Sequence, residues 1–294
     1  MSHFWQGLTF QPTADRFMPA LRAVPPFKPP VGLTLELSEQ IPQITEFLKM
    51  NFGKVGGPRL CPILCPEELI LTATDLSGQI VGSIRYRRAA TFEGQSIHCI
   101  DCFCVKQEYR GSGLATALLL TLHELTNKRN LRYSIFLKEG RPIPGQIPFY
   151  SSTYVYKATT TDNPKMKPIP TDLAVRLADC YRQMNPDTVW IHSPDNPNQA
   201  WYLYKDGIQT LFVCIQDSFQ EWRGGRIGWL TACFRIGSVP LDMTLSVPGF
   251  RWIWSDKVFL NGDEQGWIDD GPFHWYGYQW TSCLRPSRCY AIVV

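Results

Sequence analysis

The stretch from residue 95 to residue 128 constrains the fold of this chain more than any other segment. Ser96 to Val105 predicts a strand, and Gly113 to Lys128 is amphipathic and predicts a helix. A short loop containing Arg110-Gly-Ser-Gly joins them. Glycines let a backbone approach a ligand closely, and a helix N-terminus presents N–H groups and partial positive charge. A generic tight turn is the alternative, but strand, glycine loop and helix in this order predict a diphosphate site.

The rest of the sequence predicts two similar structural units, each with a helix followed by several strands. Helical spacing marks Glu39 to Asn51 and Leu173 to Gln183, and strand patterns mark Glu67 to Thr74, Ile80 to Arg87, Leu131 to Phe136, Thr210 to Ile215, Arg226 to Phe234, Gly271 to Thr281 and Tyr290 to Val294. A linker-like stretch, residues 159–171, lies between the two sets. We therefore expect an α+β fold of two similar halves, residues 1–158 and 159–294, with mixed twisted β-sheets flanked by helices.

Charge and composition argue against several classes of function. The 29 basic and 26 acidic residues give a net charge of +3, which is too balanced to indicate nucleic-acid binding. No apolar run reaches the roughly 18–20 residues that span a membrane, and the N-terminus lacks a secretory pattern. We therefore expect a cytoplasmic, monomeric protein whose ten cysteines are reduced.

Two groups of cysteines raise the question of zinc. Three residues separate Cys61 from Cys65, and Cys99, Cys102 and Cys104 lie together in a predicted strand. Structural zinc sites usually combine two pairs of ligands, each pair only a few residues apart in the sequence. Cys102 and Cys104 instead share one face of a strand, as core residues do. We expect no metal site, and we interpret the histidines as core or surface residues, namely His98, His123 and His192.

The glycine loop carries a resemblance to a known superfamily. Arg110-Gly-x-Gly-x-Ala115, between a strand and a leucine-rich helix, resembles the pantetheine-diphosphate loop of the GNAT acyltransferases. Glu108 stands where that family usually has Gln or Arg. The resemblance implies a tandem, pseudo-twofold GNAT-like fold that takes acyl-CoA as co-substrate. The residues that it assigns to acyl-CoA here are Phe103, Cys104, Val105, Arg110, Gly111, Ser112, Gly113, Leu114 and Ala115.

Four segments resemble, in the same order, the N-myristoyltransferase family within that superfamily. They are the aromatic arm His3-Phe-Trp5, the run Cys102-Phe-Cys-Val105 before the glycine loop, Trp201-Tyr-Leu-Tyr in the second half, and Asp270-Gly-Pro-Phe273-His-Trp-Tyr-Gly-Tyr-Gln-Trp280 near the end. The chain then closes on an apolar strand, Ala291 to Val294, as that family does.

The resemblance implies transfer of a fatty acyl group, myristoyl, from myristoyl-CoA to the N-terminal glycine amine of a protein. It implies that the backbone amides of Cys102 and Phe103 form an oxyanion hole and that the terminal carboxylate of Val294 is the base. The N-terminal arm, His3, Phe4 and Trp5, would cover the acyl-CoA. The acceptor peptide would contact Phe149, Tyr150, Asp270 and Phe273.

Two alternatives stay open. A GNAT N-acetyltransferase that uses acetyl-CoA on an amine is favoured by Gly111-x-Gly113, which resembles the general GNAT pattern more than that of N-myristoyltransferases. The other alternative is a non-catalytic module that binds acyl-CoA or a peptide. Residues added after Val294 should leave an acetyltransferase active but inactivate an enzyme that uses its terminal carboxylate. A binding module would hold its ligand without turnover.

Overall fold

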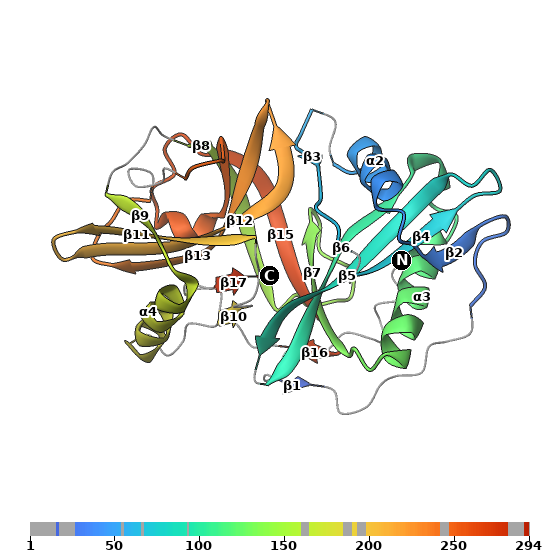
Figure 1. Cartoon of the computed structure of the whole chain (residues 1–294), viewed down its shortest axis with the longest axis horizontal. Helices are drawn as coiled ribbons and strands as arrows, with labels where there is room; N and C mark the ends of the chain where they lie inside the picture. Colours follow the sequence, from blue (N-terminus) through green and yellow to red (C-terminus); the bar gives the residue numbers. More distant parts are fainter. Residues whose placement is uncertain are drawn as a thin grey trace.

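One large mixed sheet connects most of the molecule. The computed structural model describes residues 16–17, 27–53, 56–65, 68–92, 94–159, 165–184, 190–192, 198–241, 247–281 and 291–293. Within these residues fifteen strands share one sheet, and two short strands, β1 (Arg16–Phe17) and β16 (Trp280–Thr281), pair separately. Figure 1 shows helices α2 and α3 at one end of the molecule and α4 at the other.

The first part of the sheet is an antiparallel meander followed by a crossover. β4 (Leu69–Thr74), β5 (Ile80–Phe92) and β6 (Gln95–Val105) are antiparallel neighbours joined by short turns. The chain then passes through α3 (Leu114–Lys128) to β7 (Tyr133–Glu139), which is parallel to β6. Parallel neighbours require such a crossover connection. β2 (Thr34–Leu37) pairs with β4 and precedes helix α2 (Ile41–Asn51).

The second part repeats this arrangement. β11 (Gln199–Asp206), β12 (Gln209–Trp222) and β13 (Gly225–Ile236) are antiparallel, and β14 (Trp252–Asp256) is parallel to β13. β9 (Met166–Ile169) pairs with β11 and precedes α4 (Thr171–Met184). Two antiparallel strands, β8 (Tyr150–Ala158) and β15 (Ile268–Tyr278), join the parts in the order β7-β15-β8-β14.

Short elements complete the sheet and its loops. β10 (Trp190–His192) and β17 (Ala291–Val293) extend the sheet beyond β5, and β3 (Arg59–Leu60) pairs with β12. Two 3₁₀ turns, η1 (Gln107–Tyr109) and η2 (Lys257–Leu260), follow β6 and β14.

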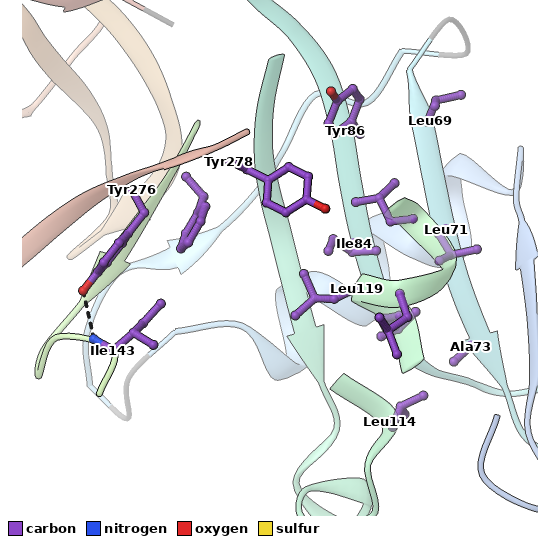
Figure 2. Packing of buried hydrophobic residues seen from close by; sticks show 14 of the residues in the cluster. Leu69, Leu71, Ala73, Ile84, Tyr86, Leu114, Leu119, Ile143, Tyr276 and Tyr278 are labelled. Carbon is purple, nitrogen blue, oxygen red and sulfur yellow. Dashed lines mark hydrogen bonds between the residues drawn. The ribbon is translucent and has the colours of Figure 1, made fainter. Parts of the chain in front are cut away.

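Each face of the first part carries its own core. Figure 2 shows the core on the α3 face, where Leu114 and Leu119 of the helix pack with Leu71, Ile84 and Tyr278 of the sheet. The same view shows the backbone N–H of Ile143 bonded to the hydroxyl of Tyr276, at 2.8 Å. A second core joins α2 to β6 and contains Ile44, Phe47, Leu48, Leu60, Leu64, Ile70, Cys102 and Cys104. β6 is therefore packed on both faces, which holds its end in a fixed place.

Gly82 sets how closely α3 lies on β5. A Cβ atom at this position would lie 3.0 Å from Cδ1 of Leu118 and 3.3 Å from Cδ2 of Leu114. We expect Gly82→Val to lower the free energy of unfolding by about 1–3 kcal/mol, because overpacking a tight core forces neighbouring side chains out of place. Urea unfolding measures this, with Leu76→Ala as control, since Leu76 is 92% exposed. Equal stability of Gly82→Val and the native chain would show that α3 does not rest on this glycine.

The α+β class and the GNAT-like architecture predicted from the sequence are confirmed. The predicted linker, residues 159–171, was partly wrong, because residues 166–169 form β9 against β11. β8 and β14 were not predicted as strands. The boundary between residues 158 and 159 stays a prediction, and it falls directly after β8, which pairs with β14 of the second part.

Candidate active site

The sheet opens between β6 and β7. Their parallel pairing runs only from Ile97 opposite Tyr133 to Cys99 opposite Ile135. β6 continues to Val105, while β7 continues to Glu139 as a partner of β15. The two strands therefore separate after Cys99, and the backbone of β6 beyond this point is free of β7.

A β-bulge lies in β6 just past this opening. Asp101 pairs with Arg85 and Cys104 pairs with Ser83, so Cys102 and Phe103 together oppose one residue of β5. Cys102 has a φ of 49°, which is uncommon for a residue with a side chain. A bulge of this kind disrupts the ladder and turns backbone groups out of the regular pattern. The bulge thus offers backbone N–H groups at the mouth of the opening.

Ser83 holds one side of this bulge in place. Its hydroxyl donates a hydrogen bond of 2.9 Å to the carbonyl of Cys102, and the side chain is fully buried. This carbonyl and the N–H of Phe103 belong to one peptide unit. In a trans peptide the two groups point in opposite directions. Fixing the carbonyl therefore also fixes the direction of the Phe103 N–H.

The glycine loop, residues 106–113, follows the bulge and leads into α3. Gly111 and Gly113 have φ values of 83° and 88°, which favour glycine, and an added Cβ would meet no atom within 4 Å at either position. Lys106 N–H bonds to the carbonyl of Val81 at 2.9 Å, and the Tyr109 hydroxyl bonds to Asp75 at 3.2 Å. The loop is anchored at its start and open to solvent at its glycines, as a diphosphate site requires.

Several predicted side chains have local roles in this loop. The Nε–H of Arg110 donates to the carbonyl of Val105 at 3.1 Å, and the Ser112 hydroxyl donates to the carbonyl of Tyr109 at 2.7 Å. Glu108 lies 2.8 Å from Lys106 Nζ. A basic partner therefore offsets the carboxylate that replaces the usual Gln or Arg.

Three predicted site residues at the bulge, at the end of β6 and at the start of α3 have buried side chains. Cys102, Cys104 and Leu114 belong to the two cores and are at most 5% exposed, so any contact with a ligand comes through their backbone. Burial raises the pKa of the Cys104 thiol to about 11 and of Cys99 to about 12. These thiols are protonated at neutral pH, which disfavours them as nucleophiles. Phe103, Val105 and Ala115 are partly exposed beside them.

A buried ion network flanks the bulge, and sequence reasoning did not find it. Asp101 accepts hydrogen bonds from Arg85 Nε at 2.6 Å, Arg85 Nη2 at 2.9 Å and Arg87 Nε at 2.8 Å. Arg85 also bonds to Glu68 at 3.1 Å. Burial opposes ionisation of Asp101, but the charges of Arg85 and Arg87 outweigh it and lower its pKa to about 2. The signal in the sequence was Arg85-x-Arg87, two charges on one face of a strand.

The residues predicted to contact the acceptor lie on or beside the next two strands after β7, namely β15 and β8. Phe149 and Tyr150 are buried at the start of β8, and Phe273 packs against Tyr154 and Trp254 with ring centroids 4.9 and 5.2 Å away. Asp270 accepts a bond of 3.0 Å from the indole N–H of Trp254. The structure thus brings Asp270 and Phe273 together around Trp254. Sequence reasoning missed Asp256, a buried carboxylate that bonds to the hydroxyl of Tyr150.

The arm residues His3, Phe4 and Trp5 and the terminal Val294 lie outside the described residues. The preceding strand β17 is described: Val293 pairs with His192, which in turn pairs with Thr91 of β5. Thr91 lies opposite Ser96 of β6, six residues before Cys102. The base function of Val294 stays a prediction.

The two buried histidines are core residues, as predicted. His98 stacks on Tyr86 with ring centroids 4.7 Å apart, and His123 bonds to the hydroxyl of Tyr278. In the described part of the chain, no three His, Cys, Asp or Glu side chains are grouped to hold a metal ion. No helix among the described residues is long and apolar enough to span a membrane.

Substitution of Gly113 tests whether the glycine loop binds CoA. We expect Gly113→Ala to weaken CoA binding roughly tenfold, or about 1.4 kcal/mol, because a methyl group would project from a loop whose backbone must meet the diphosphate. Gly207→Ala is a matched control, since Gly207 also has a positive φ and open space but lies between β11 and β12. Calorimetric titration with CoA measures both. The same affinity in the two variants would exclude the loop from CoA binding.

Comparisons with known proteins agree with this geometry. Residues 66–153, which contain the opening, the bulge and the glycine loop, match the family model described as an acetyltransferase (GNAT) domain. A search of curated proteins returned no sequence match. A solved structure of Saccharomyces cerevisiae N-myristoyltransferase with bound myristoyl-CoA and inhibitors has a TM-score of 0.64 at 10% identity, over 99% of this chain and 93% of that chain.

Two other solved structures are also similar. Another structure of the Saccharomyces cerevisiae enzyme with bound myristoyl-CoA has a TM-score of 0.62 at 9% identity, over 97% of this chain and 91% of that one. A GCN5-related N-acetyltransferase from Anabaena variabilis has a TM-score of 0.45 at 15% identity, over 83% and 72% of the two chains. Residues 66–153 thus match a GNAT acetyltransferase domain, and the chain has a GNAT-like fold similar to that of N-myristoyltransferase.

Proposed function

We propose that this protein is an acyl-CoA-dependent N-acyltransferase that moves a fatty acyl group, myristoyl, from CoA to the N-terminal glycine amine of a protein. One observation carries the proposal: a strand opening, a backbone bulge at Cys102 and a glycine loop before α3 follow each other within fifteen residues, 99–113. The GNAT match to residues 66–153 supports the reaction class. The likeness to N-myristoyltransferase over nearly the whole chain supports the choice of acyl group and acceptor.

The proposed binding mode follows the order of these features along the chain. The diphosphate of CoA lies at the N–H groups of Gly111, Ser112 and Gly113, with Arg110 beside it. The pantetheine arm runs between β6 and β7, beside Phe103 and Val105. This places the thioester near the bulge. The first half, residues 1–158, then holds acyl-CoA under the arm His3 to Trp5, and residues 159–294 supply much of the acceptor site.

The proposed chemistry is direct transfer. The N–H groups of Cys102 and Phe103 bond to the thioester oxygen as negative charge develops on it. The acceptor amine attacks the carbonyl carbon, a C–N bond forms, the C–S bond breaks and CoA leaves as its thiolate. The proton of the amine passes to the terminal carboxylate of Val294. This route requires no metal and no covalent acyl-enzyme, and we place it in the cytoplasm.

A second function is favoured by a specific observation. The matching family model describes an acetyltransferase, and its span ends at residue 153, before the second half begins. A GNAT N-acetyltransferase that uses acetyl-CoA on an amine would use the same bulge and loop. A non-catalytic binding module would keep the loop and lose turnover.

Turnover of acyl-CoA thioesters of graded length separates these functions. The assay follows release of free CoA thiol with a peptide that begins with glycine, for the native chain and for a chain extended by a few residues after Val294. We expect the C14 thioester to be preferred and the extension to abolish turnover while CoA binding persists. Transfer of acetyl alone, with a harmless extension, would establish the acetyltransferase instead. Binding of CoA with no turnover of any thioester would leave only the binding module.

A further inference from the structure

A small pocket lies where β8, β13 and β14 meet, and we call it the Asp256 pocket. Its volume is about 10 Å³, which is room for one group the size of a water molecule, such as an ammonium head group. Its lining residues are Tyr150, Tyr154, Trp229, Leu230, Thr231, Asp256 and Phe259. β13 and β14 are parallel, and their pairing ends at Leu230 opposite Ser255, although β13 continues to Ile236. The pocket therefore lies at a second opening between parallel strands, in the position that the β6–β7 opening has in the first half.

The second opening also has a bulge. Leu230 pairs with Ile215 and Ala232 with Cys214, so Thr231 is an extra residue in β13. No helix is present in the described residues between β13 and β14, which are 237–241 and 247–251. The first opening, in contrast, has a glycine loop and α3 beside it. The described part of the second opening therefore has no helix N-terminus at which a diphosphate could bind.

Asp256 places a buried carboxyl group in the wall of the pocket. The side chain is 3% exposed and accepts hydrogen bonds from the hydroxyls of Tyr150 and Ser152 and from Val258 N–H at 2.9 Å. A carboxylate has about four acceptor positions, so one position stays open. Across the described ranges the structure gives Asp256 no basic partner at salt-bridge distance, whereas Asp101 has both Arg85 and Arg87. A buried carboxylate without a cation is costly, and burial raises the pKa of Asp256.

Tyr154 and Trp229 line the pocket beside this carboxylate, and Trp254 and Trp275 pack against these two rings. The ring of Tyr154 lies 4.6 Å from that of Trp254, Trp254 lies 5.1 Å from Trp229, and Trp229 stacks on Trp275 at 6.0 Å. Aromatic faces attract cations, most strongly where water is excluded. A carboxylate surrounded by tyrosine and tryptophan rings is a suitable environment for an ammonium group, which would supply the missing positive charge.

We propose that the Asp256 pocket binds an ammonium group of the acceptor against the carboxylate of Asp256 and the rings of Tyr154 and Trp229. This inference rests on the proposed function, which supplies the acceptor. Tyr150 pairs with Trp275, and Trp275 pairs with Leu137 of β7, so the pocket lies two or more strand spacings, at least roughly 10 Å, from the β6–β7 opening. The bound ammonium is therefore not the amine that is acylated but a second cationic group, and the preferred acceptors carry two.

Binding of a simple cation to the full-length protein tests this inference. The probes are n-propylammonium chloride and n-propanol, which differ in charge but little in size, and the readout is tryptophan fluorescence. We expect n-propylammonium to bind saturably to the native chain and to Asp206→Asn, and at least tenfold more weakly to Asp256→Asn. Asp206 is a matched control because it is an exposed carboxylate that pairs with Lys165. n-Propanol should not bind.

The controls separate this inference from the proposed function. Equal binding of n-propanol and n-propylammonium to the native chain would overturn the ammonium pocket, and this comparison needs no variant. Unchanged n-propylammonium binding by folded Asp256→Asn would overturn it too. If CoA binds and acyl transfer proceeds but n-propylammonium does not bind, the pocket fails and the proposed function stands. If n-propylammonium binds and CoA does not, the proposed function fails, and with it the assignment of the pocket to an acceptor.

Discussion

Replacing Ser83 by alanine is expected to lower kcat for acyl transfer about 10²-fold while KM for acyl-CoA stays within about twofold. The hydroxyl of Ser83 holds the Cys102 carbonyl at 2.9 Å, and this fixes the N–H of Phe103 on the other side of the same peptide. Loss of one oxyanion-hole donor costs on the order of 10²–10³ in rate. Because the bulge acts on the transition state, the loss should appear in kcat rather than in KM.

A matched control distinguishes this positioning role from a general loss of stability. Ser134 is a fully buried serine on β7, so Ser134→Ala removes a similar hydroxyl away from the bulge. We expect both variants to lose similar stability in urea but only Ser83→Ala to lose kcat. Ser83→Thr keeps the hydroxyl and should restore part of the rate. An equal fall in kcat for both alanine variants would refute a special role for Ser83.

Asp101→Asn is expected to lower the free energy of unfolding by about 2–3 kcal/mol. The substitution removes the negative charge between Arg85 and Arg87, and the loss is smaller than for a fully buried pair because the Asp101 side chain is 26% exposed. Urea unfolding at pH 7 measures the change. Asp206→Asn, in an exposed pair with Lys165, should show little change, and a similarly small effect for Asp101→Asn would mean that the network does not stabilise the fold.

The same network predicts how stability depends on pH. The pKa of Asp101 is lowered to about 2 from a model-peptide value near 4, so its contribution is present above pH 4 and is lost as the pH falls towards 2. The difference corresponds to about 2–3 kcal/mol. The native chain should therefore lose more stability between pH 4 and pH 2 than Asp101→Asn does. Parallel pH profiles would contradict the assigned pKa.

The regular part of the fold was predictable because its signals are local. The apolar stripe of α3 and the turn at Asp75 to Gly78 predicted the helix, the β4–β5 hairpin and the strand before the glycine loop. Their ends differ by one or two residues from the prediction, except that β5 continues to Phe92, five residues past the predicted end at Arg87. β8 was missed because its sequence, Tyr-Ser-Ser-Thr-Tyr-Val-Tyr-Lys-Ala, directly follows the prolines at positions 142, 144 and 148, which are typical of a loop. A strand that begins directly after turn residues is hard to predict from a single sequence.

The site was only partly predictable, because its geometry depends on tertiary contacts. The resemblance identified Cys102 and Phe103, but nothing in a cysteine predicts a φ of 49°, which the register between β5 and β6 imposes. Asp256 and Tyr150 are 106 residues apart and meet only because β8 pairs with β14. No periodicity in the sequence reports such a contact.

Hydrogen exchange with and without a non-hydrolysable myristoyl-CoA thioether tests the central claim that acyl-CoA binds between β6 and β7. We expect protection in residues 102–113, which contain the bulge and the glycine loop, and in residues 136–139, the part of β7 beyond the opening. We expect no comparable protection in β13 or β14. Binding of the thioether without protection of residues 102–113, or with protection confined to the β13–β14 opening, would contradict it.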